Sequence, residues 1–313
     1  MINGVGAYSE IIYLFHMPLF FAISGFLYGY KELKNIGRPQ DLIEKKLISL
    51  GIPYVVFSVI YICFNVVMQK FAQTNTVTSM RSIAALLWNP VAQYWFIWVL
   101  LIYFIIVACC GNTYTKLKIL TVIGAAVSLT ENFLMNGLNT AYHNGLAYFF
   151  YFSIAAMVGY NFRKRENKEL CASIETVVIL LISGFSFALL ARKPEFVGAF
   201  ILRASLLRVL GIVAFSTSII CVAKIEIIKE ILVRAGEYSW YIFLLHSYFL
   251  CATRIVLKKI LPQGNQWIEV LIGMTVSVGG CMLVGLISKK FRCLDCIFYP
   301  QHLRKRSVKK SEQ

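Results

Sequence analysis

The stretch that decides the fold is IIYLFHMPLFFAISGFLYGY, residues 11–30. About 20 apolar residues at a rise of 1.5 Å each match a hydrocarbon core about 30 Å thick, so the stretch predicts a membrane-spanning helix. His16 is its one ionisable side chain, and Pro18 follows two residues later. An imidazole in hydrocarbon is costly without a partner or water, and Pro18 leaves a nearby carbonyl without its helical N–H. The small pair Ser24 and Gly25 allows another helix to approach closely. We therefore expect a polar pocket inside a helix bundle.

The composition indicates a membrane protein throughout. The 313 residues are 58% hydrophobic, whereas a soluble domain is about 45–50% apolar. The net charge of +16 would favour nucleic-acid binding in a soluble protein. Here Lys and Arg gather between long uncharged runs, as they do in the cytoplasmic loops of membrane proteins. We expect the lipid bilayer as a partner and no nucleic acid.

The cysteines and the loops define the domain prediction. Nine cysteines lie mostly in apolar runs and show no disulfide spacing. Cys293 and Cys296 form a C-x-x-C pair, but a four-ligand metal site needs two more groups, so we predict no metal. No cleavable signal pattern occurs, and no loop is long enough to fold separately. The expected organisation is one transmembrane domain over residues 1–290 and a basic cytoplasmic tail over residues 291–313.

The apolar runs predict an all-α polytopic membrane protein with about nine transmembrane helices. The runs are residues 11–30, 47–68, 93–110, 117–133, 145–160, 173–190, 200–222, 238–257 and 267–287. Most basic residues fall in the set of connections that includes the polar loop at 31–46 and the C-terminal tail, so the positive-inside rule places both in the cytoplasm. An odd number of spans then places Met1 outside, which indicates that one helix is missing at the front.

Five ionisable side chains lie in or near the outer and central parts of these spans: His16, Glu131, Arg203, Arg208 and His246. Each is expensive alone in lipid, so together they predict a polar cavity that opens outward. Other readings stay open for four of them. His16 could bond to a neighbouring helix, Arg203 could extend to the outer interface, and Glu131 could lie in the headgroup layer. His246 suits core packing and function equally well, whereas Arg208 lies a turn deeper and needs a partner.

The opening stretch also carries a resemblance. FHMPLFFAISGF, residues 15–26, resembles the F-H-M-P-L-F-F-x-x-S-G-F signature of the membrane-bound acyltransferase 3 family, whose polytopic enzymes O-acylate sugars and other cell-surface molecules. The H-M-P and S-G elements at fixed spacing are the specific part. Three later passages are similar to family patterns in the same order: KLISLGIPY at 46–54 to R-x-x-R-L-x-x-P-Y, QYWFI at 93–97 to x-x-W-F-[IL], and YSWYIFLLH at 238–246 to x-S-x-x-I-Y-L-L-H. Ser49 replaces the second basic residue of the first of these patterns.

The resemblance implies a ten-helix bundle with both ends in the cytoplasm. The nine cysteines, the basic tail and the absence of targeting motifs fit a bacterial inner, or cytoplasmic, membrane. It implies acyl transfer from acyl-CoA, usually acetyl-CoA, as a co-substrate with no bound cofactor. The acceptor would be an outward-facing hydroxyl of a cell-envelope or exopolysaccharide sugar, or of a lipid-linked glycan precursor. The family's catalytic His closes its first helix as Gly-His, and no such pair precedes His16. We therefore expect this sequence to begin just after the family's first helix, and His16 to match a second family position.

The resemblance and the polar residues together give a predicted site. In such a site a His base must reach the acceptor hydroxyl, and basic side chains must stabilise the oxyanion charge. Lysines near the cytoplasm can bind CoA phosphates, or they can simply set the topology of the chain. The residues assigned to these roles are His16, His246 and Arg208 as catalytic, Arg203, Glu131 and Trp95 as substrate-binding, and Lys45 and Lys46 as acyl-CoA-binding.

Two other classes of function remain open from sequence. Intramembrane His, Arg and Glu also suit a transporter or flippase of an envelope precursor, although no internal repeat or matching pair of Gly- or Pro-broken helices occurs. A non-catalytic partner in an envelope-assembly complex would follow if the missing first helix carried the family's base.

Overall fold

A computed structural model describes residues 4–31, 33, 38–69, 79–111, 113–134, 140–164, 174–192, 200–260 and 266–301. Within these residues all regular structure is helical and no strand occurs, which confirms the all-α class. Each of the nine predicted spans overlaps one long helix. Six helical stretches in the described part are long and apolar enough to cross a membrane: Pro39–Met68, Ala92–Cys110, Ala141–Lys164, Ser205–Val222, Glu226–Leu257 and Trp267–Lys290. The protein is therefore an integral membrane protein.

The chain forms two compact units, each built from two separated stretches. The first unit is Met1–Leu42 with Ile102–Leu232, and the second is Ile43–Leu101 with Val233–Gln313. The first unit contains α1 (Gly4–Lys31), α5 (Tyr114–Leu134), α6 (Thr140–Lys164), α7 (Ile174–Arg192) and α8 (Phe200–Val222). The second contains η1 (Leu47–Gly51), α3 (Ile52–Met68), η2 (Met80–Ile83), η3 (Ala92–Tyr94), α10 (Gln266–Lys290) and α11 (Arg292–Phe298). Three helices begin in one unit and end in the other: α2 (Pro39–Lys46), α4 (Trp95–Cys110) and α9 (Glu226–Ile260).

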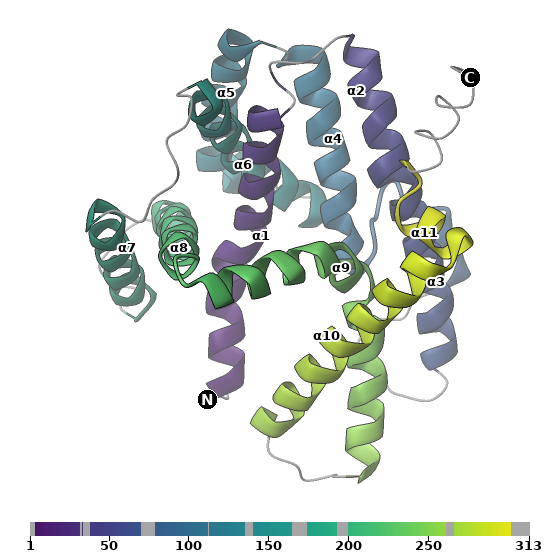
Figure 1. The fold of residues 1–313 in the computed structure, drawn as a ribbon. Helices are drawn as coiled ribbons and strands as arrows, with labels where there is room; N and C mark the ends of the chain where they lie inside the picture. Colours follow the sequence, from purple (N-terminus) through teal and green to yellow (C-terminus); the bar gives the residue numbers. More distant parts are fainter. Residues whose placement is uncertain are drawn as a thin grey trace. The chain divides into compact units, whose positions relative to one another are not determined.

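Helices α1 and α6 pack side by side (Figure 1), and glycines at the contact bring their backbones close together. A Cβ added to Gly25 would lie 2.0 Å from the Phe152 carbonyl oxygen, and one added to Gly29 would lie 1.9 Å from that of Ala156. From the other helix, a Cβ on Gly159 would lie 2.2 Å from the Phe26 carbonyl oxygen. The expectation that Gly25 allows close helix approach is thus confirmed. Ser24 instead donates to Phe20 O of its own helix, at 2.9 Å.

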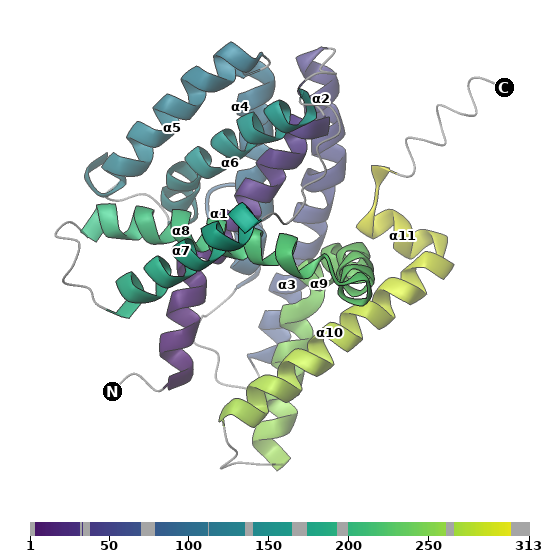
Figure 2. The ribbon, with the colours of Figure 1, turned by 60° about the vertical axis from the view of Figure 1, so that its left-hand side comes forward.

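Aromatic rings fill the first unit beside this contact. The Tyr103 ring lies 4.9 Å from Phe21 and 5.3 Å from Phe152, and its hydroxyl donates to Gly145 O. Because a phenol must find an acceptor when it is buried, this bond allows a polar ring in the core. On the other side of the unit α7 packs against α8, and both run side by side in Figure 2. Leu181 and Phe185 of α7 are 65% and 67% exposed, as suits a helix that faces lipid.

Several helices extend beyond the predicted apolar runs, and two of them show why. The predicted polar loop ends early, because α2 is helical from Pro39 and continues through the π-helical turn η1 into α3. A proline in the first turn and an acid at the N-terminus favour this start, and the Arg38 N–H donates to Asp41 Oδ2 at 3.3 Å. Helix α9 likewise begins at Glu226, twelve residues before its predicted span at 238–257. Charged helical turns add no apolar signal, so hydropathy misses them.

The start of the predicted tail is folded in the second unit. Phe298 of α11 is 5% exposed, and its ring lies 4.7 Å from Tyr241 and 5.1 Å from Phe57. Trp240 Nε1 donates to Phe298 O at 2.9 Å. Burial raises the pKa of the neighbouring Tyr299 to about 12. The domain boundary at residue 290 stays a prediction, and the basic residues from 304 onward lie outside the described residues.

Candidate active site

In the first unit, Arg208 of α8 lies over the face of Tyr148 of α6. The guanidinium carbon is 5.1 Å from the ring centroid, and Tyr148 is only 7% exposed. The same ring lies 6.0 Å from Phe21 of α1, so Arg208 is held where α1, α6 and α8 meet. An aromatic face stabilises a cation by about 2 kcal/mol or more where water is excluded. The expectation that Arg208 has a partner is therefore confirmed, and that partner is an aromatic ring.

A buried hydroxyl lies one helical turn before Arg208. Ser205 Oγ is inaccessible to solvent, and among the described residues it makes no hydrogen bond. A buried polar atom of this kind is normally satisfied by water or a ligand. Together, Ser205 and Arg208 place hydrogen-bond donors on one side of α8.

His16 lies away from the glycine contact of α1. It falls at the helical spacing of Phe20 and Ile23, which are 46% and 45% exposed, and is itself half-buried. Its Nδ1 lies 3.0 Å from Ile12 O, so in the neutral ring Nδ1 carries the proton and Nε2 the lone pair. The preceding residue, Phe15, packs against Gly211 of α8, because a Cβ there would lie 2.7 Å from Phe15 Cβ.

For two predicted substrate-binding residues, the structure describes the backbone but not the side chain. Arg203 lies in α8, and Glu131 lies in α5. Their side chains lie outside the described part of the structure, so their roles stay predictions.

In the second unit, His246 has the same tautomer as His16. Its Nδ1 lies 2.9 Å from Ile242 O and 3.1 Å from Phe243 O, which assigns the Nδ1 proton to these carbonyls and the lone pair to Nε2. The ring is half-buried near the middle of α9. An imidazole oriented in this way can accept a proton at Nε2.

The stretch at 93–97 runs beside His246 in the opposite direction. Gln93 Nε2 donates to Ser247 Oγ at 2.6 Å, and the Tyr94 hydroxyl donates to Leu244 O at 2.7 Å. The Phe96 ring lies 5.6 Å from that of Phe243. Two passages far apart in the sequence are thus neighbours in the second unit. Trp95 lies in the same stretch and is half-buried, although its role in substrate binding stays a prediction.

Lys45 and Lys46 end α2, next to the π-helical turn Leu47–Gly51. Lys45 is exposed and Lys46 is half-buried. Their role toward acyl-CoA stays a prediction, as does the single cavity expected to collect all five ionisable side chains. In the described residues, no group of three or more His, Cys, Asp or Glu could hold a metal ion.

Sequence reasoning missed the tyrosines of both sites. Tyr148 is one of 17 tyrosines and lies in a strongly aromatic helix, so nothing in its spacing distinguishes it. Tyr94 falls inside the quoted passage at 93–97, but an aromatic residue at the start of a span is typical of the headgroup interface. The structure instead shows it 0% exposed and bonded to α9.

The class of protein follows from comparison with known families. The family model described as an acyltransferase domain matches residues 2–286, which is most of the chain. The chain therefore belongs to the acyltransferase 3 family. No curated protein and no solved structure matches it.

Proposed function

We propose that this acyltransferase moves an acyl group, acetyl in the first instance, from acyl-CoA to a hydroxyl of a cell-envelope or exopolysaccharide sugar. It would act in the bacterial cytoplasmic membrane with its C-terminus in the cytoplasm. The observation that carries the proposal is His246, whose Nδ1 is bonded to backbone carbonyls so that Nε2 can act as a base. Family membership supports the class of reaction.

The proposed reaction needs a base, and His246 is the candidate for that role. His246 Nε2 removes the proton of the sugar hydroxyl while the oxygen attacks the thioester carbonyl. The tetrahedral intermediate carries its negative charge on the former carbonyl oxygen. When the C–S bond breaks, CoA leaves as a thiol after taking the proton back from the imidazolium. The products are the sugar ester and CoA.

In the first unit, Arg208 is the candidate for binding a negatively charged group of a substrate. A guanidinium held over an aromatic face in an apolar bundle is already desolvated, so it interacts strongly with an anion. Because the guanidinium is planar and carries five donors, it suits an oxyanion or a phosphate of the substrate better than a lysine would. Lys45 and Lys46 are proposed to hold CoA phosphates as point charges.

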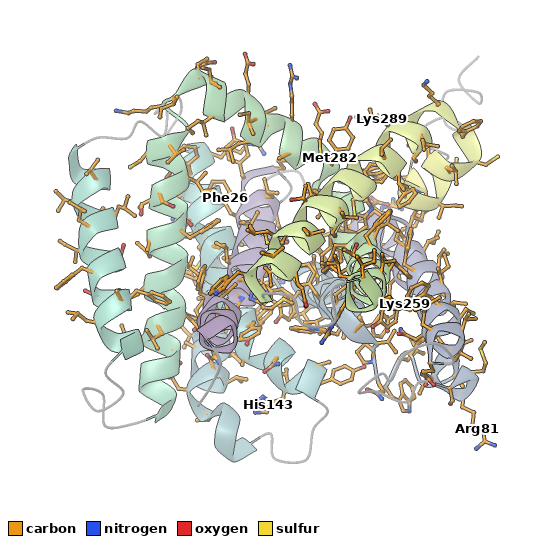
Figure 3. All side chains as sticks on the ribbon, turned by 90° about the horizontal axis from the view of Figure 1, so that it is seen from below. Phe26, Arg81, His143, Lys259, Met282 and Lys289 are labelled. Carbon is orange, nitrogen blue, oxygen red and sulfur yellow. The ribbon has the colours of Figure 1, made fainter. Side chains whose placement is uncertain are left out.

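The test uses the full chain in lipid nanodiscs with acetyl-CoA labelled in its acetyl group and glycans from a bacterial envelope. We expect label in the glycan fraction and an equal amount of free CoA, measured chromatographically because nine cysteines would react with a thiol reagent. His246→Gln should lower the rate by about 100-fold, the usual contribution of a general base. His16→Gln, at the other histidine proposed as catalytic, should also lower the rate in this assay. His143→Gln, on α6 (Figure 3), is the matched control and should stay within about twofold of wild type.

Two results would contradict the proposal. Folded wild type that moves glycans across a vesicle membrane without acylating them would identify a transporter. An unchanged rate in His246→Gln would remove the assigned base.

A further inference from the structure

The turn of α9 that carries His246 is joined by hydrogen bonds to three other elements of the second unit. Within this turn the carbonyls of Leu244 and His246 and the side chains of Ser247 and Tyr248 all take part. The bonds are Tyr94 Oη to Leu244 O at 2.7 Å, Gln93 Nε2 to Ser247 Oγ at 2.6 Å, Ser277 Oγ to His246 O at 3.1 Å, and Tyr248 Oη to Phe57 O at 3.2 Å. The positions of η3, α10 and α3 are thus all tied to one helical turn.

Tyr94 is the most enclosed donor of this set. It is 0% exposed, its hydroxyl lies 3.2 Å from that of Tyr248, and its ring meets the Tyr61 ring at 5.8 Å. Leu244 lies inside α9, so its carbonyl already accepts the helical bond from the residue four positions later. The Tyr94 bond therefore uses the second lone pair of that oxygen. It is not needed to complete the helix, and what it adds is a fixed position of α9 relative to η3.

The backbone before Tyr94 is strained in a way that supports this reading. Ala92, which opens η3, has a φ of 45°, the single positive value outside glycine among the described residues. Such a conformation costs about 1–3 kcal/mol and persists where the surroundings over-determine it. Here it directs the next two side chains, Gln93 and Tyr94, onto α9.

We propose that Tyr94 is a positioning residue for His246, which fixes the turn of α9 so that Nε2 of the imidazole meets the acceptor hydroxyl. The inference rests on the proposed function, in which His246 is the base. A base misplaced by about 1 Å can cost a reaction about 100-fold, so one buried hydrogen bond near it has a large effect on rate.

The kinetic test compares Tyr94→Phe with Tyr61→Phe in nanodiscs. Both changes remove one hydroxyl and keep the ring of the same aromatic group. Tyr94→Phe should lower kcat about tenfold and leave the KM for acetyl-CoA within about twofold, because the bond acts on chemistry and not on binding. Tyr61→Phe should stay near wild type. In a His246→Gln background, Tyr94→Phe should cause no further loss, since the two residues act as a unit.

A second readout does not depend on acylation. Diethyl pyrocarbonate modifies unprotonated imidazole nitrogens, and the modified residue is identified by peptide mass spectrometry. In Tyr94→Phe, modification of His246 should be about threefold faster, because the turn opens more often, while His143 keeps its wild-type rate. Tyr61→Phe should change neither rate.

The outcomes separate the two proposals. If wild type acylates nothing, the proposed function fails, and the modification rates alone decide whether Tyr94 positions His246. Equal modification of His246 in wild type and Tyr94→Phe would overturn the positioning role. So would a loss of kcat in Tyr94→Phe that persists in full after His246 is replaced.

Discussion

At the residue scale, Arg208 shows how a permanent charge is kept inside an apolar bundle. The described structure gives it the Tyr148 face at 5.1 Å. An aromatic quadrupole stabilises a cation without neutralising it, which lowers the cost of burying the guanidinium.

This arrangement predicts different effects for two replacements of Tyr148. Tyr148→Leu removes the π face and should lower stability by about 2 kcal/mol, the worth of a desolvated cation–π contact. Tyr148→Phe keeps the face and should lose less than about 1 kcal/mol. Thermal unfolding of both variants in one detergent measures the difference. Equal losses in the two variants would show that the ring face does not hold Arg208.

A second residue-scale prediction concerns Ala92. Because its φ of 45° suits glycine, Ala92→Gly should raise stability by about 1 kcal/mol if η3 keeps its geometry. All five tryptophans lie in the second unit, at residues 88, 95, 98, 240 and 267, so their fluorescence during unfolding reports on the unit that contains Ala92. A lower stability would show that the positive φ carries no strain.

The sequence identifies some of these residues and not others, for a physical reason. His246 and Arg208 are visible because an ionisable side chain stands out in an apolar run. Tyr148 and Tyr94 are amphipathic, and a membrane sequence contains such residues both in cores and at interfaces. Their importance comes from the residues they meet on distant helices, which a single sequence does not show.

At the element scale, the α1–α6 contact depends on the absence of side chains. A methyl group on Gly25 would meet the Phe152 carbonyl, which is backbone and cannot turn aside. Gly25→Ala should therefore lower stability by about 1–3 kcal/mol, as overpacking does. Gly184→Ala in α7 is the matched control, because nothing lies within 4 Å of its added Cβ, and it should be neutral or slightly stabilising.

The measurement for this pair is circular dichroism of the helices during heating. Tryptophan fluorescence is unsuitable here, since the first unit has no tryptophan. A melting temperature for Gly25→Ala equal to that of Gly184→Ala would contradict the close contact of the two helices.

Arg163 provides a second link between the same helices. Its Nη1 donates to Tyr30 O at 3.0 Å and to Lys31 O at 3.3 Å, so α6 caps the last carbonyls of α1. Charged donors at a helix C-terminus also favour its dipole. Arg163→Ala should cost about 1–2 kcal/mol in thermal unfolding, whereas its exposed neighbour Lys164→Ala should cost under about 0.5 kcal/mol. Equal losses of stability in Arg163→Ala and Lys164→Ala would mean that a positive charge at the end of α6 matters, and that the hydrogen bonds to the α1 carbonyls do not.

The elements themselves are largely predictable. Nine apolar runs gave nine long helices in the described residues, because burial of the backbone in lipid leaves few alternatives. The ends were less predictable, as at Pro39 and Glu226, where polar turns continue the helices. Gly25 correctly predicted that another helix approaches α1 closely. The sequence did not show that Gly29 and Gly159 take part, or that α6 is the partner helix.

At the scale of the whole molecule, the excess of basic residues predicts one orientation. If the 31–46 segment and the C-terminal tail are cytoplasmic, a fluorescent protein fused after Gln313 should fluoresce in a bacterial host. An alkaline phosphatase fused at the same place, which works only outside the cytoplasm, should be inactive. The reverse pattern would invert the topology and remove Lys45 and Lys46 from the acyl-CoA side.

The interleaving of the two units was not predictable from the sequence. Each unit takes two stretches from the chain, and the joins fall inside α2, α4 and α9. The join in α4 lies within an apolar run, where no polar linker marks a boundary. Hydropathy records where a helix crosses lipid and contains no information about which helices share a core.

The glycine contact also fixes an order of events during synthesis. Gly25 meets the backbone at Phe152, so α1 cannot dock until 127 more residues have been added to the growing chain. At about 5–20 residues per second, that is a wait of about 6–25 seconds. During that time the face of α1 that carries Gly25 and Gly29 is in the membrane without α6 packed against it, and His16 lies in the same helix. Until α6 leaves the ribosome, the glycine face of α1 lacks the backbone surface that it packs against in the folded protein.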